Sequence, residues 1–278
     1  MSYRKKHIKS KIRGIKPKKS VLKKPWIWAL IVLSLVIFCI LYLLLFYPGV
    51  QINNVMVIGA EKISAAELGR FTLDNAGVEL INIGSLKLAT KSIFLVDKEK
   101  IGGKVLKEYP AIEKAEIDRI FFRGISIDIT ERKPAGVYCA GEEPEPLCFL
   151  MDKNGFIFEQ LAGELAGLPV VRRASADGFP STGEKIIEEA VINAILKVHE
   201  SLKKNFQVDI KQALLTSPVR LDVLTSERWK IYFNLDEDAD IDSQIIRLNL
   251  LLASEISPEA RLALQYIDLR FKDRAFYR

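Results

Sequence analysis

The sequence predicts an α+β protein with one transmembrane helix, a small β-α-α-β-β domain and then an antiparallel-sheet domain with flanking helices. Residues 26–47 form an uncharged apolar run. Several later segments alternate apolar with polar residues, as strands do, and others place apolar residues at helical spacing. We expect a basic tail at residues 1–25, a membrane helix at 26–47, a first exported domain at 50–133 and a β-rich second domain at 134–278.

The apolar run from Trp26 to Tyr47 contains 22 residues and no charged side chain. A helix rises about 1.5 Å per residue, so this run spans roughly the 30 Å hydrocarbon core of a bilayer. Lipid offers the backbone no hydrogen-bond partner, which leaves a helix as the conformation that can cross. A cleaved signal peptide is the alternative. The run exceeds the usual apolar region of roughly 7–15 residues, and Phe46–Gly49 has no small-x-small cleavage site, so an uncleaved anchor is favoured.

Charge is distributed unevenly on the two sides of this run. Residues 1–25 carry eleven Lys or Arg and no acid, and the first acid of the chain is Glu61. The tail is therefore +11, whereas the rest is −5, with 30 Lys or Arg against 35 Asp or Glu. Basic flanks stay in the cytoplasm, which predicts an exported remainder. We expect the tail to contact anionic membrane lipid and no nucleic acid, because it is short, contains Tyr3 as its one aromatic residue, and lies against the membrane.

The first exported domain begins with an apolar strand at residues 52–58. Ser64 and Glu67 form a capping box that opens a helix, and Gly77 is a plausible stop for it. Residues 78–91 are less regular, and we interpret them as a loop or an inserted small element.

A second helix is predicted from Asp97 to Tyr109. Ile101, Val105 and Tyr109 follow one another at four-residue spacing, and Pro110 ends the helix. Two strands follow. Their inward alternation falls on Ala115, Ile117, Ile125, Ile127 and Ile129.

The second domain combines several strands with two helices. Residues 149–158 read as two strands around an Asn-Gly turn. A helix is expected at 184–204, with Ser181 and Glu184 as its cap, and another at 240–255. Further strands are predicted by alternation at Val219, Leu221 and Val223, at Trp229, Ile231, Phe233 and Leu235, and at Ile267, Leu269 and Phe271. The pattern indicates an antiparallel sheet carrying two helices.

Three segments resemble the POTRA domain and following linker of the FtsQ/DivIB bacterial cell-division proteins. They read VMVIGAEKISAAEL, SIFLVDKEKI and YPAIEKAEIDRIFFRGISIDITERKPAGVY. The shared pattern is a strand that ends at a Gly, then Ser-x-x-Glu at Ser64 to Glu67, a hydrophobic-Asp lead into the second helix, a Pro, and a strand that ends in Glu131-Arg132-Lys133-Pro134-Ala135. Near the C-terminus, YIDLRF at 266–271 resembles the final strand of that family. The chain departs from the family in the insert at 78–91 and in ending at Arg278, soon after that strand.

The resemblance implies a non-enzymatic membrane scaffold of the division machinery that helps control septal peptidoglycan synthesis. It implies a single-pass protein of the bacterial cytoplasmic membrane at the septum. The implied partners are FtsB-like and FtsL-like single-span coiled-coil proteins, with FtsK-like proteins and septal wall synthases as further candidates. Two other functions stay open: a POTRA-containing accessory protein for outer-membrane assembly or secretion, and an exported enzyme acting on the cell wall.

The final strand, at about 265–277, is the expected partner-binding site. In the family this strand lies at the sheet edge and takes up a strand from FtsB, and edge strands present unpaired backbone groups. If Ile267, Leu269 and Phe271 face the core, the cations between and after them face outward. Those cations could instead be gatekeepers that deter unwanted pairing. The residues assigned to the site are Arg270, Phe271, Lys272, Asp273, Arg274, Ala275, Phe276 and Tyr277.

Residues suited to catalysis are few, and we expect no cofactor and no metal. The two histidines are His7, in the tail, and His199, in a predicted helix. No Gly-x-Ser-x-Gly elbow or metal-ligand spacing occurs. The acids Glu142/Glu143, Glu188/Glu189 and Asp236/Asp238/Asp240 are close in sequence, and a carboxylate pair can cleave glycans, but solvated turns and helix faces explain them better.

The chain has three cysteines, of which Cys39 lies in the membrane run. Cys139 and Cys148 lie in the exported part. In an oxidising compartment these two could close a small loop, and two free buried thiols are the alternative.

Overall fold

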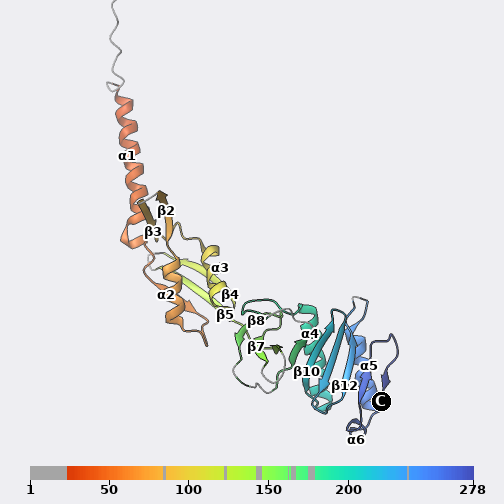
Figure 1. The fold of residues 1–278 in the computed structure, drawn as a ribbon. Coiled ribbons are helices and arrows are strands. Elements are labelled where there is room, and N and C mark those ends of the chain that lie inside the picture. The colour runs from red at the N-terminus through yellow and green to blue at the C-terminus, as the bar shows by residue number, and fades with distance from the viewer. Residues whose placement is uncertain are drawn as a thin grey trace, which may run out of the picture.

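The structure is a computed structural model that describes residues 24–83, 86–121, 124–141, 146–161, 163, 167–174, 179–236 and 238–278. The basic tail up to residue 23, with His7, lies outside the described residues, as do Arg123, Glu142 and Glu143. The described chain begins with the long helix α1 (Pro25–Phe46), continues into a first α+β unit and ends in a larger second unit (Figure 1).

The helix α1 is the apolar helix predicted from sequence, and it is long and apolar enough to cross a bilayer. The last carbonyl groups of any helix have no partner within it. In α1 the Ser92 hydroxyl donates to the Leu44 carbonyl at 2.7 Å. The Leu45 carbonyl accepts from the Gln51 amide at 2.6 Å and from the Thr90 hydroxyl. The first unit is thus bonded directly to the end of α1.

The first unit has a three-stranded sheet in the order β1-β5-β4, with β1 parallel to β5 and β4 antiparallel to it. Its elements are η2 (Pro48–Val50), β1 (Val55–Ile58), α2 (Ala65–Asn75), β2 (Val78–Ile83), β3 (Leu86–Thr90), α3 (Lys98–Glu108), β4 (Ile112–Ile120) and β5 (Gly124–Glu131). The helices α2 and α3 pack against this sheet, and the predicted strands and helices are all present.

Local sequence explains these elements. Ser64 and Asp97 each accept a backbone N–H three residues ahead and so cap α2 and α3. Ile125, Ile127 and Ile129 of β5 are buried in the core, as the alternation predicts. The segment at 78–91 is not an irregular loop: β2 and β3 form an antiparallel hairpin that is a separate two-stranded sheet.

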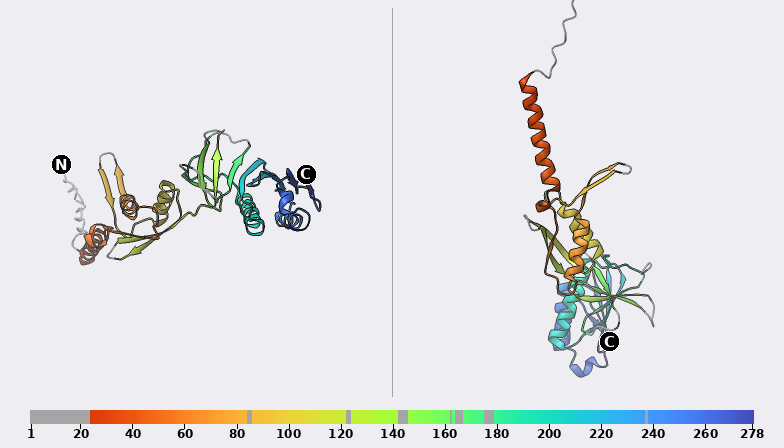
Figure 2. Two further views of the ribbon diagram at one scale, coloured as in Figure 1. Left: turned by 90° about the horizontal axis from the view of Figure 1, so that it is seen from below. Right: turned by 90° about the vertical axis from the view of Figure 1, so that its left-hand side faces the viewer.

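The second unit is built on a nine-stranded, mostly antiparallel sheet in the order β14-β13-β12-β11-β10-β9-β6-β7-β8. The large helices α4 and α5 contribute to its main hydrophobic core and lie on one face of the sheet (Figure 2). Its elements are β6 (Gly136–Ala140), β7 (Leu147–Met151), β8 (Ile157–Gln160), β9 (Val170–Arg173), α4 (Glu189–Phe206), β10 (Ile210–Ser217), β11 (Arg220–Thr225), β12 (Lys230–Asn234), α5 (Ile241–Ser254), α6 (Pro258–Arg261), β13 (Tyr266–Asp268) and β14 (Phe276–Tyr277).

One helix boundary predicted from sequence is wrong. The helix α4 begins at Glu189, and Ser181 and Glu184 do not cap it. The preceding segment is extended: the Ile157 N–H donates to the Glu184 carbonyl at 3.0 Å, and the Ile186 N–H donates to the Gly155 carbonyl at 2.9 Å. The segment therefore pairs with the β7–β8 hairpin through its backbone, although the spacing of its apolar residues matches a helix.

The junction between the two units is held by Glu131 and Arg132, at the end of β5. The Glu131 carboxylate accepts the N–H groups of residues 61, 62 and 63 at 2.9 to 3.1 Å. Burial raises the pKa of Glu131, but these N–H groups outweigh it and hold the pKa below its ordinary value. Arg132 pairs with buried Asp152 of the second unit and lies over the Phe156 ring at 4.7 Å. Glu131 therefore fixes the end of β5 within the first unit, and Arg132, the next residue, connects that end to the second unit.

Candidate functional site at the C-terminal sheet edge

The C-terminal segment forms a short hairpin at one end of the large sheet. The strand β13 runs parallel to β12, and β14 returns antiparallel to β13 as the terminal strand. The single strand predicted at 265–277 is therefore wrong. Asp273 has a left-handed φ of 58°, a conformation that suits a turn and not a strand. The chain reverses there before it reaches Phe276.

Phe271 does not continue the inward-facing row. Ile267 and Leu269 are completely buried, whereas Phe271 is 51% exposed. Its ring instead meets the Phe276 ring edge-on at 5.3 Å. With the half-exposed Tyr277, these rings place apolar surface beside the terminal strand.

A row of paired side chains crosses the sheet and ends on this strand. Asp222 is the register partner of Tyr232, Tyr232 of Asp268, and Asp268 of Phe276. The residues adjacent to them, such as Ile231 and Phe233, belong to the core beneath α4 and α5. Because side chains alternate along a strand, the row lies on the face away from the two helices.

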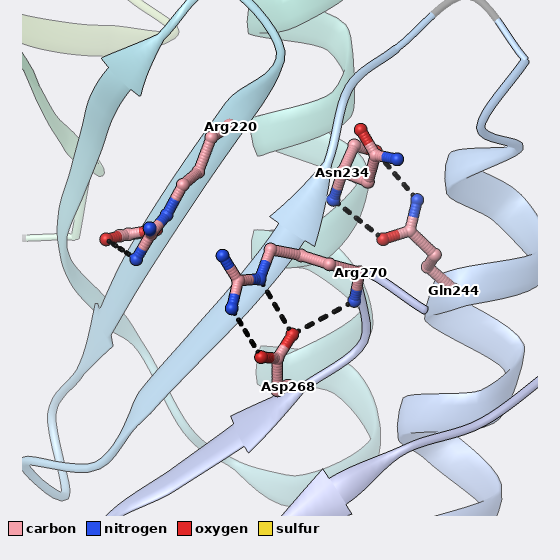
Figure 3. Close-up of polar contacts among 6 residues, drawn as sticks. Arg220, Asn234, Gln244, Asp268 and Arg270 are labelled. Atoms are coloured by element: carbon pink, nitrogen blue, oxygen red, sulfur yellow. Dashed lines mark hydrogen bonds and ion pairs between the residues drawn. The ribbon is translucent and has the colours of Figure 1, made fainter. Parts of the chain in front are cut away.

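Two arginines bracket Tyr232 within this row. Arg220 bonds Asp222 at 2.7 Å, and Arg270 bonds Asp268 at 2.6 Å, each pair on one stretch of chain. Both guanidinium groups lie over the Tyr232 ring, at 5.2 and 5.4 Å from its centroid. Arg220, Asp268 and Arg270 are shown in Figure 3, which draws the three hydrogen bonds from Arg270 to Asp268. The Arg270 side chain is thus bound to Asp268 and packed over Tyr232 within the sheet.

The Asp268–Arg270 pair is electrostatically tight. Burial alone would raise the pKa of Asp268. The hydrogen bonds from Arg270 and the charges of Arg270 and Arg220 outweigh burial and lower the pKa. The same hydrogen bond to Asp268 raises the pKa of Arg270. Both groups remain charged at neutral pH, which fixes the chain where it leaves β13.

The helix α5 secures the sheet just beyond the point where β13 ends. The Gln244 side-chain amide pairs with Asn234 of β12, accepting its N–H at 3.0 Å and donating to its carbonyl at 2.7 Å (Figure 3). Arg247, one turn later, donates to the carbonyls of Phe271 at 2.6 Å and Leu269 at 3.3 Å. At the end of β12, the Gln244 side chain thus makes the backbone hydrogen bonds that a neighbouring strand would make. Arg247 anchors the turn after β13 to α5.

A pocket of ≈ 410 Å³ lies between this turn and the β12–α5 loop. Asp236 and Asp238 line it on one side, and Lys272 and Asp273 on the other, with Arg247 in its wall. It is a polar recess of mixed charge beside the apolar rings. The arrangement suits a peptide segment that places polar groups in the recess and a backbone strand along β14.

The predicted site residues separate into two groups. Arg270 is bound internally, and Ala275 is partly buried against the core. Exposed residues are the ones available to a partner; they are Phe271, Lys272, Asp273, Arg274, Phe276 and Tyr277.

Sequence reasoning missed the residues that support this edge. Gln244 falls within the helix predicted at 240–255, and its spacing there indicates no role at the strand end. Arg220 and Asp222 alternate visibly with core residues, but a single sequence does not show that two strands separate their strand from the terminal strand β14. The Asp-x-Arg spacing at 268–270 was a usable signal for an ion pair along one strand.

Asp240 and His199, two of the candidate catalytic residues, have structural contacts. Asp240 caps α5 by accepting the Asp242 N–H at 3.1 Å. His199 is half-buried in α4; burial, aided by the charge of Lys203, lowers its pKa. Within the part of the chain that the structure describes, no group of three or more His, Cys, Asp or Glu side chains is placed to hold a metal ion.

Cys139 and Cys148 are register partners on β6 and β7, and a disulfide joins them in the structure. Cys39 lies exposed on α1. The pair lies toward the β8 end of the sheet, remote from β14 in the strand order, so it does not contribute to the C-terminal sheet edge.

Comparison with models of known protein families identifies part of the first unit. Residues 78–132 match the family model of the FtsQ-type POTRA domain. The match covers the β2–β3 hairpin, α3, β4 and β5, and ends on Arg132 at the junction. The expectation that residues 78–91 are an insert that departs from the family is therefore wrong, because this segment lies within the matched domain. A search of curated proteins gives no match to the chain.

Proposed function

We propose that this chain, an FtsQ/DivIB-like protein, is a non-enzymatic single-span scaffold of the bacterial division machinery. The observation that carries the proposal is the FtsQ-type POTRA domain at 78–132, directly after a helix apolar enough to cross a membrane. The presence of a domain of this type supports the inference that the chain is a membrane protein related to cell division, and the domain's family is generally non-enzymatic. The N-terminus lies in the cytoplasm, both α+β units lie outside it, and the protein acts at the septum.

The C-terminal edge is the surface proposed to bind a partner. The strand β14 ends the sheet, so a strand from another chain can extend the sheet by pairing along it. Phe271, Phe276 and Tyr277 supply half-exposed aromatic anchors. Lys272 and Arg274 are exposed and suit acids on the incoming segment, where charge complementarity selects the partner.

The partners proposed are FtsB-like and FtsL-like single-span coiled-coil proteins. Their membrane anchors place their exported segments at the same bilayer, and a short strand after a coiled coil can reach β14. FtsK-like proteins and septal wall synthases are further candidates for other surfaces of the scaffold.

The test is capture of FtsB-like exported segments by the full chain in detergent. Phe271→Ala and Arg274→Glu should each lower capture several-fold, because both side chains are exposed beside β14. A truncation after Arg270 removes β14 and should abolish capture. Glu159→Ala, at an exposed position on β8 at the opposite end of the sheet, is the matched control and should capture normally.

Unchanged melting of the two point variants would show that the edge is intact apart from the altered side chain. This control matters because the truncation also removes two carbonyl groups that Arg247 binds. Undiminished capture by all three variants would show that the binding surface lies elsewhere. Equal loss in the β8 variant would show that the effect is not specific to the C-terminal edge.

A further inference from the structure

The β2–β3 hairpin exposes an apolar face that no other strand covers. Ile81 and Leu88 are register partners, and Ile83 is paired with Leu86. Directly paired residues and residues two apart along a strand share a face, so the side chains of Ile81, Ile83 and Leu88 lie on one side of the hairpin. Ile83 is 75% exposed, and Ile81 and Leu88 are also exposed.

The opposite side of the hairpin is polar. Asn82 lies between the two isoleucines and donates to the Glu79 carboxylate at 3.1 Å. An isolated two-stranded hairpin is marginally stable in water unless its apolar face packs on something. Because this hairpin forms its own sheet, its exposed apolar face needs a covering surface.

The position of the hairpin is fixed relative to the membrane helix. Thr90, the last residue of β3, donates to the carbonyl of Leu45, and Ser92 donates to that of Leu44, both in the last turn of α1. The Gln51–Ser92 bridge and the bond from the Ile52 N–H to the Lys91 carbonyl tie the same base to the chain leaving α1. The hairpin therefore starts where α1 leaves the hydrocarbon core.

The direction of the hairpin carries it back toward the bilayer. In the right-hand view of Figure 2 the hairpin leaves the end of α1 obliquely and points upward, away from the second unit. Figure 1 likewise shows β2 and β3 beside the last part of α1. The six residues of β2 extend about 20 Å at roughly 3.3 Å per residue, enough to bring Ile83, at the end of β2, to the membrane interface.

A second apolar feature lies at the same end of the first unit. Phe94 and Phe121 are exposed, and their rings are 6.2 Å apart. Phe121 begins the β4–β5 turn, and the Ile125 N–H just after it donates to the Asn54 carbonyl, in the chain leading from α1. Exposed apolar side chains thus occur in two places near the C-terminal end of α1.

We propose that the β2–β3 hairpin inserts its apolar face into the outer headgroup and acyl boundary of the bilayer that α1 crosses. The hairpin is then a second membrane contact, and with α1 it sets the orientation of the first unit against the membrane surface. Lipid is the occupant because α1 fixes the bilayer at the base of the hairpin, and because the acid of the hairpin lies on its polar side. This contact does not depend on any division partner.

The test uses the full chain in nanodiscs of phosphatidylethanolamine and phosphatidylglycerol. Ile83→Cys, in a Cys39→Ser background first shown not to label, receives an environment-sensitive fluorophore. Its emission should shift to the blue. Lipids with a nitroxide high on the acyl chain should quench it, and aqueous iodide should quench it several-fold less than a label at Leu262→Cys. Leu262 is 76% exposed and lies in the second unit, far along the chain from α1.

Asn82→Cys is the matched control, because it is adjacent to Ile83 but on the polar side of the hairpin. Its label should be quenched less by the nitroxide and more by iodide than the label at position 83. A label at 83 that iodide reaches as readily as the one at 262 would overturn the proposal. A label protected from iodide but not quenched by nitroxide lipid would also overturn it, since a second copy of the chain would then cover the face.

Discussion

At the residue scale, the Asp268–Arg270 pair determines how the chain leaves β13. Hydrogen bonds from Arg270 more than offset the burial of Asp268 and lower its pKa. A carboxyl whose pKa is lowered in the folded state contributes stability above its unfolded pKa, near 3.9, and loses it as pH falls through the folded value. The same pair orients Arg270 over Tyr232, so it also fixes the strand on which β14 depends.

Asp268→Asn should therefore reduce the free energy of unfolding by about 1–2 kcal/mol at pH 7. The deficit should hold down to about pH 5 and shrink below that, because the carboxyl of the unfolded chain takes up a proton first and the native carboxyl follows only at its lower pKa. Denaturant unfolding of both proteins across pH 2–8 measures this. A deficit that stays constant to pH 2 would show that the charge of Asp268 is not its source.

The Cys139–Cys148 pair gives a second test at this scale. The two residues are directly opposite on adjacent strands, and the structure joins them. We expect thiol labelling of the unreduced chain, purified after export, to modify Cys39 alone. Labelling of all three cysteines would mean that the exported pair is reduced in its compartment.

At the element scale, alternation identified the strands of the first unit but missed or misplaced some strands of the second. The isoleucines of β5 alternate with polar residues because one face is dry and the other wet, so the strand was visible in the sequence. All five residues of β6 are buried, so that strand has no alternation to detect. In the sequence, Phe271 continues the alternating pattern of β13. In the structure its side chain is exposed, and the chain turns at Asp273.

The remaining features of the candidate site arise from contacts that a single sequence does not show. Gln244 closes the end of β12 from a helix ten residues later, and no local spacing predicts that. The extended segment before α4 carries apolar residues at a helical interval, so pairing with the β7–β8 hairpin, and not periodicity, decides its conformation.

The register of β5 predicts opposite outcomes for two adjacent substitutions. Ile127 is completely buried, so Ile127→Asp places an unpaired charge in the core and should cost on the order of 4 kcal/mol, enough to unfold the first unit. Asp128 is exposed, so Asp128→Ala should change stability by less than about 0.5 kcal/mol. Thermal melts of the two variants compare them; similar melting temperatures would mean that the register is wrong.

At the scale of the whole molecule, the chain runs from a membrane helix through a POTRA unit to an edge far along the chain from the bilayer. The eleven cations before residue 26 predict a cytoplasmic N-terminus. A phosphatase reporter that is active only outside the cytoplasm, fused after Arg278, should be active in cells. Activity from a cytoplasm-only reporter at that position would reverse the topology and remove the basis for septal partners.

The most direct test of the central claim is a contact map of the C-terminal edge in dividing cells. A photo-crosslinking residue at Tyr277, on the terminal strand β14, should form a product with an FtsB-like single-span coiled-coil protein. The same residue at Glu159, on β8 at the other end of the same sheet, should form none with that protein. The account is contradicted if the product forms at position 159 and not at 277, or if neither position crosslinks while the septum assembles normally.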